Sequence, residues 1–135
     1  MQIVKWRESY ETGVASMDNQ HKTLLDLINQ LYPIVRDHRG QEEISKIVDA
    51  CLSYAKKHLG DEEQLLLDNN FPGLQEQLDH HAQFTETVNT FAKQLTDSPD
   101  TVVPELYAYL RTWWISHIVG IDKKYGPYLQ EKGVK

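Results

Sequence analysis

Four segments of the chain carry apolar residues at every third or fourth position, and this period limits the possible folds more than any other feature. The spacing places the apolar side chains on one face of an α-helix. The segments span about residues 18–37, 42–68, 73–95 and 100–119. Strand-like alternation is absent from the sequence, and short polar stretches with proline or glycine separate the segments. The pattern predicts a single all-α domain, an antiparallel up-down-up-down four-helix bundle.

Residues 1–16 precede the first periodic segment and lack its spacing. We expect an extended N-terminal arm whose aromatic residues, Trp6 and Tyr10, pack on the core. Ser16 or Asp18 is expected to cap the first helix, because both side chains can accept hydrogen bonds from free backbone N–H groups.

Prolines mark the expected interruptions. Pro33 lies inside the first helical pattern and is expected to kink or end that helix near Tyr32, because proline lacks a backbone donor. Gly126-Pro127 is expected to stop any helix beyond residue 119.

The composition excludes some classes of function. A net charge of −6 argues against nucleic acid and, more weakly, against anionic membranes. Cys51 is the single cysteine, so an intrachain disulfide is not possible and we expect the protein in a reducing compartment. Cys51 lies on an apolar helix face and is therefore expected to be buried. Neither a signal peptide nor a membrane-spanning run is visible. We therefore expect a cytoplasmic protein, and a monomer.

Histidines are the first sign of chemistry. Of six histidines, four fall on predicted inner faces, one on each helix: His21, His58, His81 and His117. His38 lies near a polar loop and is expected at the surface. One core histidine is usually an ordinary hydrogen-bonded residue. Four from facing helices instead indicate a metal site, because the interior of a bundle is where helices assemble such sites.

Two carboxylates extend the pattern. Glu62 follows His58 by four residues and shares its helix face. Asp122 follows His117 by five, which would separate the two side chains in a regular helix; Gly120 permits either a π-bulge or a helix end that returns Asp122 to the site. Imidazole and carboxylate ligands without thiolate suit iron, manganese or zinc.

The number of candidate ligands favours two metal ions. A structural zinc site needs four ligands and usually includes cysteine, whereas six candidates, two of them carboxylates able to bridge, suit a metal pair. The chain has no Glu-x-x-His pair, which ferritin-like di-iron bundles use twice.

These motifs together resemble the hemerythrin family, in particular its single-domain bacteriohemerythrins, over nearly the whole chain. The segments that carry the resemblance are Trp6 to Val14, Met17-Asp18-Asn19-Gln20-His21, His58-Leu59-Gly60-Asp61-Glu62, Phe71-Pro72-Gly73-Leu74, and His117 to Asp122 followed by Tyr125.

The resemblance implies two non-haem iron ions joined by an oxo or hydroxo bridge. It assigns Glu62 and Asp122 as bridging ligands, His21 and His58 to the iron that keeps an open position for dioxygen, and His81 and His117 to the other iron.

The chain departs from the family at two positions. Gln77 stands where the family has a third histidine on the second iron. Either Gln77 binds weakly through its amide oxygen, or it hydrogen-bonds to a water ligand, or His80 takes its place; we favour the first two. Trp114 stands where the family often has a leucine in the dioxygen pocket. Trp113 and Trp114 are therefore candidate pocket residues. Trp114 has two equally supported interpretations: it narrows the dioxygen pocket, or it is an ordinary core residue.

The leading functional hypothesis is reversible dioxygen binding for carriage, storage or sensing. One alternative is a di-iron oxidoreductase that acts on peroxide or nitric oxide through an open position at Gln77. Another is a bundle that senses iron or docks a partner. The sequence offers no conventional acid–base catalytic pair, which favours binding over catalysis.

Overall fold

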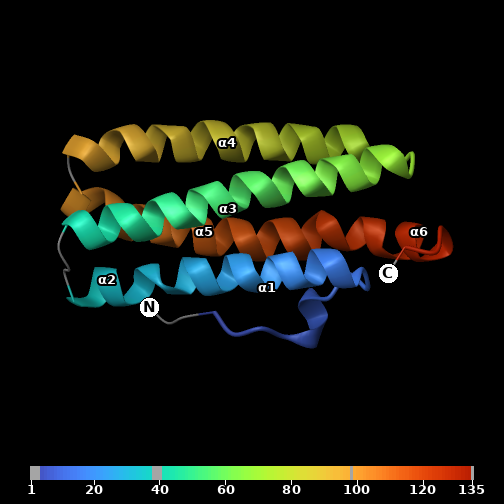
Figure 1. The fold of residues 1–135 in the computed structure, drawn as a ribbon, viewed down its shortest axis with the longest axis horizontal. Helices are drawn as coiled ribbons and strands as arrows, with labels where there is room; N and C mark the ends of the chain where they lie inside the picture. The colour runs from blue at the N-terminus through green and yellow to red at the C-terminus, as the bar shows by residue number, and fades with distance from the viewer. Residues whose placement is uncertain (1–3, 38–40, 98, 135) are drawn as a thin grey trace.

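Long helices run side by side and alternate in direction along the chain (Figure 1). The structure is a computed structural model that describes residues 4–37, 41–97 and 99–134. The main helices are α1 (Ala15–Asn29), α2 (Leu31–Asp37), α3 (Gln41–Asp68), α4 (Leu74–Asp97) and α5 (Pro99–Gly120). Because α2 continues the line of α1, these elements form the predicted antiparallel four-helix bundle. His38, expected at the surface, lies outside the described residues.

The first helix is interrupted earlier than predicted. α1 ends at Asn29 and α2 begins at Leu31, so the break precedes the expected position at Tyr32. Pro33 explains the difference. Its ring crowds the carbonyl four residues earlier, at Asn29, and it cannot donate a hydrogen bond to that carbonyl. Pro33 itself is accommodated in the first turn of α2.

The predicted caps of the first helix are wrong. α1 starts at Ala15 with Val14 at its N-cap, and no side chain caps it. Asp18 instead accepts hydrogen bonds from the backbone N–H and hydroxyl of Thr12, each at 2.8 Å, and from Gly13 N at 3.2 Å. The carboxylate lies within the helix and holds the arm against its first turn.

The arm includes a short 3₁₀ helix, η1 (Glu8–Tyr10), and otherwise runs along the outside of α1 (Figure 1). Val4 exchanges two hydrogen bonds with the Asn29 side chain, at 3.1 and 2.8 Å. Trp6 and Tyr10 pack against the main apolar core, as predicted.

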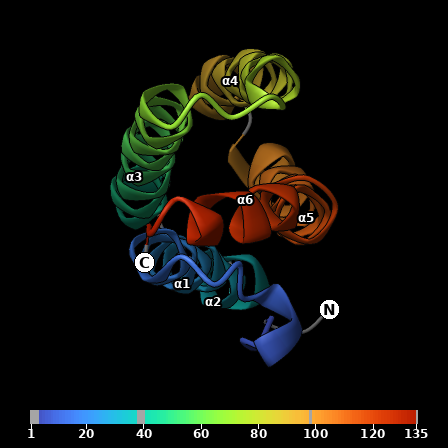
Figure 2. The same cartoon turned by 90° about the vertical axis from the view of Figure 1, so that its right-hand side faces the viewer.

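The chain does not stop being helical after residue 119, which corrects the expectation for Gly126-Pro127. A 3₁₀ turn, η2 (Asp122–Lys124), leads into α6 (Tyr125–Glu131), which lies across one end of the bundle (Figure 2). Pro127 is tolerated because it falls in the first turn, where its missing N–H has no helical partner. Gly126 is required by close packing, since a Cβ there would overlap the carbonyl oxygen of Thr12.

Two apolar clusters fill the interior. The larger includes Leu24, Ala55 and Ile118, and the smaller, beneath α6, consists of Val14, Met17, Leu66, Tyr125 and Leu129. His21 and Glu62 fall between them along α1 and α3, so buried polar groups separate the two clusters.

Cys51 is fully buried, as predicted, and burial raises the pKa of its thiol to about 12. Among the described residues, no helix is both long and apolar enough to span a membrane.

Candidate metal centre

All six predicted ligands meet in the interior of the bundle, and none is more than 3% exposed. They come from four elements of the bundle and the turn after α5. Their ligand atoms form two groups, each with its atoms within 4.8 Å of one another: His21, His58, Glu62 and Asp122 in one, and Glu62, His81 and His117 in the other. Glu62 belongs to both groups, so the site has two halves that share a carboxylate.

The two oxygens of each carboxylate point to different halves. Glu62 Oε2 lies 3.5 Å from Nε2 of both His21 and His58, while Oε1 lies 3.0 Å from His81 Nε2 and 3.7 Å from His117 Nε2.

Asp122 repeats this arrangement. Its Oδ2 lies 3.1 Å from His21 Nε2, and its Oδ1 lies 3.0 Å from His117 Nε2. Two carboxylates therefore span the same pair of histidine groups, which is the arrangement that bridging ligands need.

The end of α5 brings Asp122 to the site. The helix stops at Gly120, and the 3₁₀ turn η2 begins at Asp122. Ile121 N still donates to His117 O at 2.9 Å, so the last helical turn is intact up to this point. Of the two possibilities that the sequence left open, the structure shows the helix end.

Gln77 lies on the His81 side of the site, one turn before His81, and is 1% exposed. Its Nε2 donates to Asp122 Oδ1 at 3.0 Å, and its Oε1 has no hydrogen-bond partner among the described residues. The ring of His80 is half-buried, with its centre 6.0 Å from that of His117. Gln77 thus reaches the site, and it leaves a buried acceptor oxygen unsatisfied.

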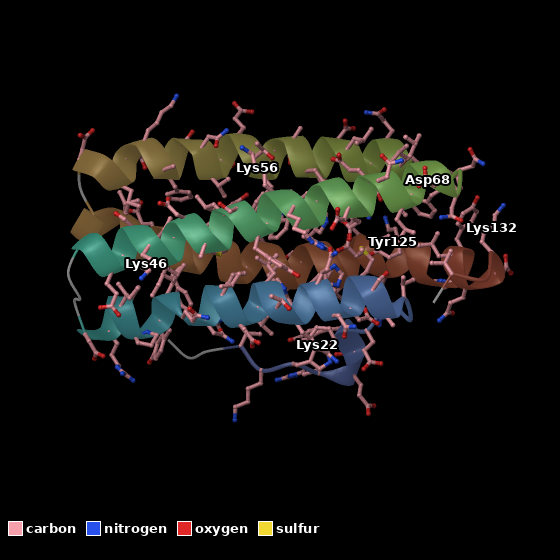
Figure 3. The ribbon with its side chains drawn as sticks, viewed as in Figure 1. Lys22, Lys46, Lys56, Asp68, Tyr125 and Lys132 are labelled. Atoms are coloured by element: carbon pink, nitrogen blue, oxygen red, sulfur yellow. The ribbon has the colours of Figure 1, made fainter. Side chains whose placement is uncertain are left out.

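Tyr125 supports the shared carboxylate from α6. Its hydroxyl donates to Glu62 Oε2 at 2.8 Å, and Figure 3 shows this residue at the end of the bundle near α6. Burial and the neighbouring Glu62 raise the pKa of Tyr125 well above its ordinary value, which keeps the hydroxyl protonated as a donor. Tyr125 belongs to the last of the motifs described above, but its spacing from Glu62 did not indicate this contact.

Two of the predicted ligand histidines have outer partners that sequence reasoning missed. His58 Nδ1 lies 2.7 Å from Gln20 Oε1, and His81 Nδ1 lies 2.9 Å from Glu63 Oε1. Both acceptors are oxygens, so each imidazole donates from Nδ1 and directs Nε2 into the site. Gln20 and Glu63 are sequence neighbours of the ligands His21 and Glu62, and that adjacency was the only available signal.

The charges in the site favour bound cations. Burial alone would raise the carboxyl pKa values of Glu62 and Asp122, but the surrounding histidines hold both below their usual range. Burial opposes protonation of His21 and His117, yet the two carboxylates raise their pKa values to about 9 and about 10. Burial lowers the pKa of His58 to about 4. Two anionic groups thus attract positive charge into an interior where unpaired charge is costly.

Several buried atoms also fit a metal rather than a closed hydrogen-bond network. Within the described part of the chain, three buried atoms lie close to polar neighbours but form no hydrogen bond of acceptable geometry. They are Nε2 of His21, Nε2 of His117 and Oδ2 of Asp122. A cation would satisfy these nitrogen and oxygen donors together, and the donor set suits first-row divalent metals.

The two candidate pocket residues lie on different sides of α5. Trp114 is fully buried, its ring contacts Trp6 and Tyr10 edge-on, and its Nε1 donates to the carbonyl oxygen of His21 at 3.1 Å. Trp113 stacks on His117 at 4.9 Å between ring centres. These contacts place both indoles beside ligand histidines, and a pocket role for them stays a prediction.

The fold and the site together define a four-helix bundle whose interior can hold metal cations in two adjoining positions. The chain belongs to the hemerythrin family: residues 12–129 match the family model described as the hemerythrin HHE cation binding domain.

Individual relatives agree along most of their length. The chain is 26% identical to a bacteriohemerythrin of Clostridium acetobutylicum, with 89% of this chain and 96% of the relative aligned. It is 28% identical to a myohemerythrin of Riftia pachyptila, covering 89% and 88% of the two chains. A solved wild-type hemerythrin superposes with a TM-score of 0.82 at 24% identity, over 93% of this chain and 97% of the other, which supports the fold.

Proposed function

We propose that the chain is a di-iron protein that binds dioxygen reversibly. The observation that carries the proposal is the pair of carboxylates that each turn one oxygen to either half of the site. Membership of the hemerythrin family supports iron as the metal and dioxygen as its ligand.

In the proposed centre each iron takes two histidines, and the carboxylates bridge. His21 and His58 would hold one iron, His81 and His117 would hold the other, and Glu62 and Asp122 would bridge them together with an oxo or hydroxo group. When bound, the iron pair supplies the two electrons that reversible dioxygen binding requires.

The chain's own residues prepare this site. Gln20 and Glu63 fix which imidazole nitrogen of His58 and His81 faces the interior, and Tyr125 holds Glu62 in place. The apolar clusters on either side restrict the access of water. Fixed ligand orientation and limited access of water both influence the affinity and reactivity of a buried metal centre.

The Gln77 position favours a second candidate function. A buried amide replaces an imidazole on the His81 half, and an amide oxygen is a weaker ligand for iron than an imidazole nitrogen. We propose that Gln77 binds weakly through Oε1 or holds a water ligand, so that this half is open to exogenous ligands. Peroxide or nitric oxide turnover is the corresponding enzymatic activity.

Anaerobic loading with ferrous iron tests these functions. We expect two irons per chain and a visible absorption band that appears in air and disappears when oxygen is removed. Sustained consumption of peroxide or nitric oxide with added reductant would support the enzymatic function and contradict the binding function. One iron per chain would show that Gln77 does not support the second site, and Q77H is the matched variant that should restore it.

The iron-sensing or docking alternative is tested by the stability of the metal-free chain. If dioxygen binding is the function, iron should stabilise the fold markedly, because it binds the native ligands and not the unfolded chain. Equal stability with and without iron would support the docking alternative.

A further inference from the structure

We propose that Glu63 is a positioning residue that supplies negative charge to the His81/His117 half of the metal centre and so strengthens metal binding there. This inference rests on the proposed function, since it assumes that both halves hold metal. It concerns a side chain outside the six ligands.

The geometry places Glu63 directly behind His81. Glu63 Oε1 lies 2.9 Å from His81 Nδ1, while His81 Nε2, on the opposite side of the ring, lies 3.0 Å from Glu62 Oε1. A carboxylate accepts hydrogen bonds, so it keeps the proton on Nδ1 and leaves Nε2 to bind metal. A carboxylate behind a ligand histidine also makes the imidazole a stronger donor.

The equivalent partner in the other half is neutral. His58 Nδ1 donates to the amide oxygen of Gln20, and the Asp61 carboxylate on this outer side accepts from Gln20 Nε2 at 3.0 Å. Asp61 also accepts from Lys57 Nζ at 3.3 Å, which neutralises part of its charge. Across the described residues, no lysine or arginine forms an ion pair with Glu63. The two halves therefore receive different amounts of charge from outside.

A groove keeps the Glu63 carboxylate hydrated. The groove lies between α3 and α4, has a volume of about 570 Å³, and is lined by Glu63 and His81 together with Lys56, Gly60, Ala82 and Glu86. Figure 3 shows Lys56 over the gap between the two helices. The Glu63 side chain is 35% exposed while His81 is 2% exposed, so solvent stabilises the charge and the imidazole carries its effect inward.

The charged outer partner and Gln77 belong to the same half. Gln77 and His81 lie one turn apart on α4, and they contact the two shared carboxylates: Gln77 Nε2 lies 3.0 Å from Asp122 Oδ1, and His81 Nε2 lies 3.0 Å from Glu62 Oε1. Charge from Glu63 and the amide of Gln77 would therefore act on the same ion.

Cobalt(II) titration tests the proposal without any dioxygen chemistry. The metal-free full chain is titrated with Co²⁺ in competition with a chelator, and the visible absorption of bound Co²⁺ gives the number of sites and their affinities. E63A should weaken the second site by about 10–100-fold, the range found when outer partners of metal ligands are removed. E63Q keeps an acceptor for His81 and loses only the charge, so it should show a smaller loss in the same site.

E86Q is the matched control, because Glu86 lines the same groove, is exposed, and lies away from the ligand histidines. It should change the affinity by less than about twofold if contact with His81, rather than general charge, is responsible. Circular dichroism of each metal-free variant verifies folding, and E63Q remains informative where E63A does not fold.

A double-mutant cycle with Q77H makes the test specific. If Glu63 and Gln77 act on the same ion, the loss caused by E63Q should shrink at least a few-fold in the Q77H background, since a third imidazole makes the charge of Glu63 less important. Wild-type binding of two Co²⁺ ions with equal effects of E63Q and E86Q would overturn this inference and leave the proposed function intact. Failure of the wild-type chain to bind two ions would overturn both.

Discussion

The two halves of the site share both carboxylates, and each adds two histidines. The side chains around those histidines differ between the halves. His21 and His58 lie edge to face, 4.7 Å apart between ring centres. The other half has His117 stacked on Trp113 and a buried amide from Gln77. In the proposed centre the shared carboxylates would define two metal positions, and the side chains found in one half only would set how tightly each position holds its ion.

The largest expected effect comes from breaking what the halves share. E62A removes an oxygen from each half at once, so metal binding at both positions should fall to near zero. Metal analysis after desalting measures this, and E105A, at an exposed position on α5, should retain the wild-type metal content. Retention of one full equivalent by E62A would mean that the halves do not depend on a common bridge.

Removing one histidine from each half should reveal the asymmetry. H81A should leave one ion in the His21 half, and H58A should leave one ion in the half that contains Gln77. We expect the ion that remains in H58A to be bound a few-fold more tightly, since its half keeps two imidazoles and the Gln77 amide, whereas the His21 half keeps two imidazoles alone. Competition with a chelator measures both, and equal affinities would contradict the asymmetry.

A smaller effect is expected from the hydroxyl that holds the shared carboxylate. Y125F removes the hydrogen bond to Glu62, and the free energy of unfolding of the metal-free chain should fall by about 1.5–3 kcal/mol, as for hydrogen bonds to charged groups. Chemical denaturation measures the change.

Y128F on the same helix is the control. Its hydroxyl donates to the carbonyl oxygens of Asn69 and Asn70, at 2.7 and 2.9 Å, away from the site. Y128F should lower stability without altering metal affinity, whereas Y125F should lower both. If the two variants have the same metal affinity, Tyr125 does not support the centre.

The smallest expected effect concerns access to the His21 half. If Trp114 narrows a pocket beside His21, W114L should speed the binding of azide to the iron-loaded protein by a few-fold. Stopped-flow absorption measures the rate, and W6F controls for loosening of the arm, because Trp6 contacts Trp114 without contacting the ligands. An unchanged rate in W114L would favour ordinary core packing.

Side chains that recur at helical spacing could be predicted from the sequence, whereas the exact ends of helices, which depend on a single turn, could not. Glu62 could be placed beside His58 because a four-residue interval has one outcome in a helix. The break after Asn29 and the helix that begins at Tyr125 could not be placed as well, because a proline alone does not locate a helix end: Pro33 and Pro127 lie in first turns, and Pro104 lies inside α5.

The outer partners of the ligands were beyond reach for a different reason. Gln20 and His58 lie 38 residues apart in the chain, and their hydrogen bond depends on how α1 rotates against α3. Helical spacing gives the face of a helix only to within a broad stripe. Asp61, Glu62 and Glu63 are neighbours in sequence, yet Glu62 lies in the interior, Glu63 contacts His81 from outside, and Asp61 contacts Gln20.

The position of Asp122 after α5 has a consequence for how the protein is made. His21, His58, Glu62 and His81 leave the ribosome well before Asp122, so a nascent chain carries a histidine-rich half-site without its second bridge. Domains of this size form contacts between distant parts of the chain only once both parts are available. The metal centre can therefore be completed only when synthesis has passed α5, and a truncated product would lack the carboxylate that retains its ions.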